Sequence, residues 1–216
     1  MNSWMNNMDK LKKAFNRAPV TVSVIGICVI VYVISFLLYG EEMNVAEGIA
    51  FGGYNPLYVC YQHEYYRLLT ANFIHFGLLH IAVNCYSLYG IGCFIESCLK
   101  TKRYIIVLLC SALATTGLPY LLFLINGFGA SSISGGISGV IFGLIGSLGA
   151  LALCYKDIFA KIFKQLFANV ALMLFISLVV PSISMSGHVS GLIGGFVVTY
   201  ILIRKPVKPK ENHLVN

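Results

Sequence analysis

Long apolar stretches dominate this sequence, and they constrain its fold more than any other feature. A membrane-spanning helix needs about 17–25 mostly apolar residues, and a lipid-exposed backbone must satisfy its own hydrogen bonds. The chain has 216 residues, of which 58% are hydrophobic and 11% charged, against roughly 25% charged residues in soluble domains. We therefore expect an all-α integral membrane protein with six spanning helices, the last three of them short, at about Val20–Tyr39, Gly77–Cys98, Tyr104–Ile125, Ser138–Tyr155, Phe163–Val180 and His188–Ile203.

Basic residues are placed between these stretches in a pattern that predicts the orientation of the chain. Of the fifteen Lys and Arg residues, all except Arg67 precede the first stretch, separate the second from the third or the fourth from the fifth, or follow the sixth. Positive charge marks the cytoplasmic side, so both termini are expected to be cytoplasmic. This topology accounts for the net charge of +7 without a nucleic-acid partner. The positive charge is also compatible with anionic membrane lipid as a partner.

The sequence divides into a cytoplasmic or interfacial segment (1–18), a six-helix domain (19–204) and a basic cytoplasmic tail (205–216). Helical spacing in the first segment predicts a short interfacial helix, carried by Trp4, Met8, Leu11 and Phe15. The first stretch is expected to be an uncleaved span. The outer loop at 40–76 is too apolar for a solvated linker, so part of it is expected to lie in the membrane. The seven cysteines form an odd set without metal spacing, and we assign them no disulfide framework.

Polar residues inside apolar stretches are costly and commonly mark function, and four of them are expected at one depth. His80 and Asn84 lie four residues apart on one helix face of the second stretch, while Ser138 opens the fourth and His188 the sixth. Counted at 1.5 Å per residue from the basic residue at each cytoplasmic end, their heights are roughly 24–30 Å. The four residues therefore form one layer just below the outer surface of a hydrocarbon core about 30 Å thick.

A serine, a histidine and a histidine–asparagine pair in one layer are suited to acyl transfer. Serine becomes a nucleophile when a base removes its proton, and His188 can act first as base and then as acid. Oxyanion donors would be His80, Asn84 and the Ser138 backbone N–H, which opens a helix with unpaired N–H groups. No Asp or Glu lies near these residues in the sequence. The predicted catalytic unit is a Ser138–His188 dyad that needs neither a metal nor a cofactor.

The ordered set of motifs resembles that of the rhomboid intramembrane serine proteases, over about Val20–Arg204. Their G-x-S-G motif is matched in the fourth stretch, H-x4-H-x3-N in the second, H-x2-G-x3-G in the sixth, and an aromatic–Arg pair in the outer loop. The residues that match are Gly136, Ser138 and Gly139; His75, His80 and Asn84; His188, Gly191 and Gly195; and Tyr66 with Arg67.

The resemblance implies a role for each matched residue. It makes residues 19–204 a six-helix rhomboid protease domain, with Ser138 as nucleophile, His188 as base, and His80, Asn84 and the Ser138 N–H as the oxyanion hole. The expected supporting residues are Gly136, Gly139, Phe142, Gly191, Gly195, Tyr66, Arg67, His75 and Glu96.

Two positions depart from the family pattern. Tyr66 stands where a Trp is usual, and Phe142, one turn after the nucleophile, stands where a Tyr often stacks on the catalytic histidine. An aromatic face is kept in both, so packing is expected to survive, although Phe142 lacks a hydroxyl that could hold His188. Arg67 is expected to hold the outer loop through its own carbonyls or lipid headgroups. His75 is either a histidine satisfied by a neighbour or a loop anchor.

The same residues also allow structural roles and other functions. Glu96 is expected to make a structural hydrogen bond near the cytoplasmic face. The glycines beside Ser138 and His188 also serve close helix packing, which is compatible with catalysis because it brings the two helices together.

The alternative functions are a catalytically inactive rhomboid-like binding or quality-control factor and a small transporter or channel. The presence of both Ser138 and His188 disfavours the former. The confinement of polar residues to the outer half disfavours the latter.

The expected substrates are other transmembrane proteins, single-span and with helix-weakening residues at the cleaved bond, because a regular helix hides its carbonyls. Lateral access past the fifth helix, with the loop at 181–187 as a cap, is the expected route. The small six-span form favours a bacterial plasma membrane.

Overall fold

A computed structural model describes residues 16–164 and 184–204, and regular structure in these ranges is helical apart from one isolated bridge, between Tyr54 and Ser134. Four helices are long and apolar enough to cross a membrane. They match the first, second, third and sixth expected spans to within three residues at each end. Their bounds are α2 Pro19–Tyr39, α6 Leu78–Leu99, α7 Thr101–Asn126 and α10 Met185–Arg204.

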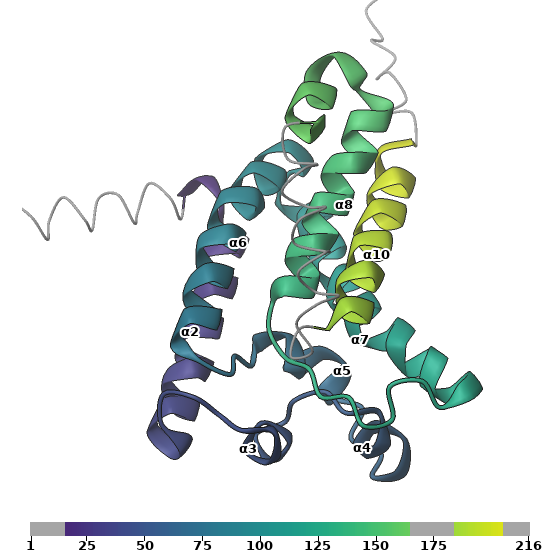
Figure 1. The fold of residues 1–216 in the computed structure, drawn as a ribbon. Coiled ribbons are helices and arrows are strands. Elements are labelled where there is room, and N and C mark those ends of the chain that lie inside the picture. The colour runs from purple at the N-terminus through teal and green to yellow at the C-terminus, as the bar shows by residue number, and fades with distance from the viewer. Residues whose placement is uncertain (1–15, 165–183, 205–216) are drawn as a thin grey trace, which may run out of the picture.

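The helix α8, Ser138–Cys154, matches the fourth expected span and forms the centre of the bundle (Figure 1). It has 17 residues, and thirteen of them are buried, in contact with α10, α7 and α6. Because other helices surround α8, its length need not match the full thickness of the hydrocarbon core. Its first residue can therefore lie below the outer surface while its neighbours continue outward.

Several sequence predictions fall outside the described residues. They concern most of the fifth span, the interfacial helix with Trp4, Met8, Leu11 and Phe15, part of the loop at 181–187, and the tail at 205–216. Residues 156–164 follow α8 and are helical. The helical membrane fold is confirmed, whereas the number of six spans and the cytoplasmic position of both termini stay predictions.

Glycines hold α8 against α10. A methyl group on Gly191 would collide with the carbonyl oxygen of Gly139, and one on Gly195 with that of Gly143. One turn further from Ser138, Thr199 on α10 donates a hydrogen bond of 2.7 Å to Ser147 on α8. Such backbone-to-backbone contact is possible only because these positions have no side chain, as in other membrane helix pairs.

The α2–α6 pair is joined at the end of the bundle away from Ser138. The Glu96 carboxylate accepts hydrogen bonds from the backbone N–H of Val20 and of Thr21 and from the Thr21 hydroxyl, at 3.1, 2.9 and 2.8 Å. Helix N-termini leave N–H groups unpaired and favour negative charge. The start of α2 has no side-chain cap of its own, and Glu96 caps it from the neighbouring helix α6.

The outer loop folds into short helices that gather at the end of the bundle where α8 begins (Figure 1). They are α3 Val45–Ala50, α4 Pro56–Tyr61, α5 Arg67–Thr70 and the 3₁₀ helix η1 Ala71–Phe73. Tyr54 and Ser134 exchange two backbone hydrogen bonds of 2.8 and 3.0 Å. These bonds attach the outer loop to the segment that leads into α8.

Candidate active site

The structure brings Ser138 and His188 into direct contact. The Ser138 Oγ lies 2.8 Å from His188 Nε2, although the residues are fifty positions apart. Ser138 is the first residue of α8, and His188 lies in the first turn of α10. The glycine contacts between these helices set the separation of the two side chains. When Nε2 accepts the serine proton, the ring must carry its other hydrogen on Nδ1.

The Phe142 ring stacks on His188. The two ring centroids are 4.3 Å apart with planes at 20°, and Phe142 has no exposed surface. Ser138 and Phe142 are four residues apart, so both project from one face of α8. The aromatic face expected at this position is therefore present, and it restricts rotation of the imidazole.

His80 and Asn84, both on α6, border the backbone just before Ser138. A methyl group on Gly136 would lie 2.9 Å from His80 Nε2 and 3.6 Å from Asn84 Nδ2. Gly136 also has a φ of +112°, which residues with a side chain rarely adopt. This position therefore requires glycine both for its backbone conformation and for the approach of His80 and Asn84.

His75 lies behind this layer, between the outer loop and α8. Its side chain is 1% exposed, its Nδ1 lies 3.1 Å from the Phe73 carbonyl, and its Nε2 accepts the Ile137 N–H at 3.5 Å. Burial, followed by the neighbouring His80 ring, lowers the pKa of His75 to about 4. The ring is therefore neutral near pH 7 and links Phe73 to the residue that precedes Ser138, an arrangement that matches the loop-anchor interpretation.

Arg67 lies in the outer loop, away from Ser138. Its Nη1 donates hydrogen bonds of 2.7 Å to the carbonyls of Ile49 and of Gly53, and its Nε pairs with Glu64. Its guanidinium also lies over the rings of Tyr58 and Tyr66, at 4.9 and 5.6 Å. The sequence left loop carbonyls and lipid headgroups open as partners of Arg67, and in the structure Arg67 contacts loop carbonyls. Glu96 likewise lies far from Ser138, at the α2–α6 junction.

Two residues near the site were not expected from the sequence. The ring of Phe76 is parallel to that of His80, with centroids 6.4 Å apart. The backbone N–H of Phe76 donates a hydrogen bond of 3.5 Å to His80 Nδ1. Thr115 on α7 packs against Gly139 and Gly191, and a methyl group on either glycine would collide with its side chain. A Phe at a loop end and a Thr inside an apolar stretch have no distinctive spacing, so only the packing identifies them.

Comparison with known proteins decides the family. The family model described as "Rhomboid domain" matches residues 62–205, a range that holds Ser138, His188, His80 and Asn84. The chain belongs to the rhomboid family. With that family and four spanning-length apolar helices, it is an integral membrane protein.

Curated rhomboid proteins from bacteria and a plant are similar to the chain. It is 30% identical over 158 residues to rhomboid protease GluP of Bacillus subtilis, covering 73% of this chain and 30% of GluP. It is 29% identical over 171 residues to RHOMBOID-like protein 2 of Arabidopsis thaliana, covering 78% and 51%. It is 26% identical over 189 residues to rhomboid protease GlpG of Yersinia pseudotuberculosis, covering 84% and 62%. The chain thus spans less than two thirds of the length of each of these relatives.

Proposed function

We propose that this rhomboid protein is an intramembrane serine endopeptidase that uses a Ser138–His188 dyad. The observation that carries the proposal is the 2.8 Å contact between Ser138 Oγ and His188 Nε2 across two packed helices. Two relatives named rhomboid proteases support it. A hydroxyl at hydrogen-bond distance from an imidazole is the arrangement that activates serine.

In the proposed reaction, Ser138 Oγ attacks the carbonyl carbon of a peptide bond while His188 Nε2 takes its proton. The tetrahedral intermediate then collapses, and the imidazolium returns the proton to the leaving amine. Water attacks the remaining ester by the same route, with His188 again as base. This second attack releases the carboxyl product and restores the serine.

The oxyanion of the intermediate would be bound by donors that meet at Gly136. His80 accepts the Phe76 N–H at Nδ1, so the neutral ring carries its hydrogen on Nε2, the atom that borders Gly136. The Asn84 amide and the Ser138 N–H complete the proposed set. Removing one such donor typically costs about a hundredfold to a thousandfold in kcat.

The remaining features of the proposal concern the whole protein. We assign residues 19–204 to a six-span rhomboid protease domain with both termini cytoplasmic, in a bacterial plasma membrane. The proposed substrates are single-span membrane proteins with helix-weakening residues near the cleaved bond. The proposed access route past the fifth helix involves residues outside the described ranges.

Covalent labelling by a fluorophosphonate tests the nucleophile. The wild-type protein in mild detergent should become labelled, and Ser138→Ala should not. Ser134→Ala is the matched control, because Ser134 lies four residues earlier in the loop and contacts Tyr54 through its backbone. Labelling of Ser138→Ala at the wild-type level would refute the assignment.

The same experiment separates the protease from an inactive binding factor. His188→Ala should abolish both labelling and cleavage of a transmembrane substrate while the protein stays folded. A binding factor would show no labelling in the wild type and would hold its partner equally well without Ser138.

A further inference from the structure

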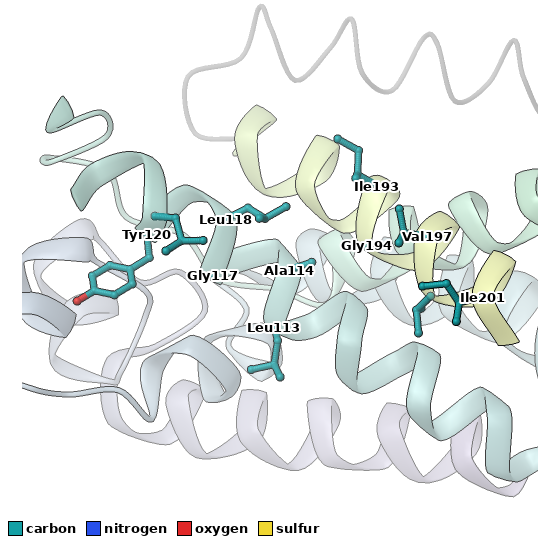
Figure 2. A pocket seen from close by; sticks show the side chains of 11 residues that line it. Leu113, Ala114, Gly117, Leu118, Tyr120, Ile193, Gly194, Val197 and Ile201 are labelled. Atoms are coloured by element: carbon teal, nitrogen blue, oxygen red, sulfur yellow. The ribbon is translucent and has the colours of Figure 1, made fainter. Parts of the chain in front are cut away.

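An apolar groove runs along the outside of the bundle between α7 and α10. Its volume of about 590 Å³ lies within the range of roughly 300–1,000 Å³ that holds small ligands. Ala114, Gly117 and Leu121 line it from α7, and Ile193, Val197 and Ile201 from α10. Figure 2 shows Ala114 and Gly117 on α7 and Ile193, Val197 and Ile201 on the neighbouring α10. The groove does not include Ser138 or His188.

Six of the eleven lining residues are exposed and the others are half-buried, so a ligand in the membrane can contact them. Leu121, Val197 and Ile201 are each about half exposed, at 53%, 48% and 56%. At Gly117, no atom lies within 4 Å of the position that a methyl group would occupy. The groove is therefore open at this glycine, and a side chain placed there would begin in the groove without a clash at its Cβ atom.

Each of the two helices carries an arginine beyond the groove, at the end predicted to be cytoplasmic. On α7, Arg103 precedes Ala114 by eleven residues, and on α10, Arg204 follows Val197 by seven, which are spacings that return to the same helix face. Gly194 packs against Ala114, so the antiparallel helices place both arginines at one end. Both side chains are exposed, and among the described residues neither is paired with a carboxylate. The Arg204 guanidinium lies over the Tyr200 ring, 5.5 Å from its centroid, a contact that leaves its N–H groups able to donate to a phosphate.

We propose that this groove binds one anionic phospholipid of the inner leaflet. One of its acyl chains would lie along the apolar walls, and its phosphate would be bound by Arg103 and Arg204. Arg204 lies about 16 Å from Ile193 along α10 at 1.5 Å per residue, close to half of a hydrocarbon core about 30 Å thick. Arginine binds phosphate through paired N–H groups, so the charge and the length of the groove both fit such a lipid.

Native mass spectrometry with matched lipids tests the proposal. The detergent-solubilised protein is mixed with phosphatidylglycerol and phosphatidylcholine that carry the same acyl chains. Two exposed ion pairs with the net negative charge of phosphatidylglycerol, each worth up to about 1 kcal/mol, should give it roughly a tenfold to thirtyfold preference. Equal retention of both lipids would contradict the proposal.

Two variants separate the headgroup from the acyl chain. Arg103→Gln with Arg204→Gln should abolish the preference, whereas Lys156→Gln with Lys161→Gln, the same change in charge elsewhere on the predicted cytoplasmic side, should retain it. Gly117→Leu should remove retention of both lipids, and Gly90→Leu, at another open glycine on α6, should not. Equal losses in a variant and its control would overturn the site.

A second measurement covers variants that fail to fold. Phosphatidylglycerol with a photoreactive acyl chain should crosslink wild-type protein at 113–121 and 193–201. Crosslinks confined to α2 or α6 would contradict the proposal. A dimer that Gly117→Leu prevents would also contradict it, because the groove would then hold a second copy of the chain. Neither readout depends on proteolysis, so failure here is distinct from failure of the proposed function.

Discussion

At the scale of single residues, backbone hydrogen bonds select different tautomers for two adjacent histidines. His80 accepts the Phe76 N–H at Nδ1, so its hydrogen is on Nε2. His75 accepts the Ile137 N–H at Nε2 and therefore donates from Nδ1 to Phe73. Which nitrogen carries hydrogen depends on the partner of the other nitrogen. His80 thus presents a donor toward Gly136, while His75 connects two backbone segments.

The lowered pKa of His75 predicts a pH dependence of stability. The unfolded chain binds a proton at this residue below about pH 6.5, whereas the folded protein does so only below about pH 4. Stability contributed by neutral His75 is therefore present above pH 6.5 and is lost as the pH falls toward 4. The expected loss is about 3 kcal/mol in the free energy of unfolding.

Denaturant titrations of the wild type and His75→Gln between about pH 7.5 and 3 measure this loss. Glutamine can donate and accept hydrogen bonds but does not titrate. The wild type should lose more stability than the variant over this interval, and their difference should become constant below pH 4. Parallel pH profiles would show that another group controls the dependence.

Replacing Phe142 by leucine should reduce turnover by releasing the His188 ring. An aromatic pair contributes about 0.5–1.5 kcal/mol, so kcat on a transmembrane substrate should fall about threefold to tenfold with little change in KM. Phe94→Leu makes the same substitution on α6, where the ring meets Phe159 edge to face, and should leave kcat unchanged. If both variants had wild-type kcat, the stack would have no part in holding His188.

At the scale of helices, α8 and α10 are the pair that assembles the proposed dyad. Ser138 and Phe142 project from α8, and His188 projects from α10 three residues before Gly191. Because Gly191 touches the Gly139 carbonyl, the distance between the helix axes directly sets the distance from Ser138 to His188. A change of a few tenths of an ångström at this crossing would therefore alter the hydrogen bond.

Gly191→Ala tests this coupling. The methyl group must push α10 away from α8, and such overpacking costs about 1–3 kcal/mol, or roughly 2–10 °C in Tm. Cleavage should fall as well, because the Ser138–His188 contact lengthens. Gly90→Ala, which meets no atom within 4 Å, is the control and should keep wild-type Tm and activity. An unchanged Tm in Gly191→Ala would contradict the tight crossing.

At the scale of the whole molecule, the outer loop covers the end of the bundle at which α8 begins. Arg67 organises this loop by bonding to Ile49 and Gly53, and Asn55 donates to the Ser132 carbonyl at 2.9 Å. The loop and the segment before α8 therefore support each other. In the predicted topology, this end faces outward and the α2–α6 junction at Glu96 lies at the cytoplasmic side.

Cysteine accessibility tests this topology. Cys154 is exposed at the end of α8, and a membrane-impermeant maleimide should label it only in inverted vesicles. A cysteine introduced at exposed Gln62 in the outer loop should be labelled only in right-side-out vesicles. Cys154→Ser identifies the first signal. Labelling of both positions from the same side would refute the predicted orientation.

The sequence by itself determined the helical membrane class, four of the spans to within three residues, and the family, because apolar runs, charge and motif spacing are properties of the chain order. The same residues also predicted that Ser138, His188, His80 and Asn84 share a depth. Depth, however, defines a layer and not a contact. Only the tertiary structure decided that Ser138 meets His188 at 2.8 Å, since that distance depends on how two glycine-faced helices cross. It also decided which carbonyls Arg67 binds and how His75 and Phe76 support the site, because these contacts join segments whose separation in sequence carries no information about their separation in space.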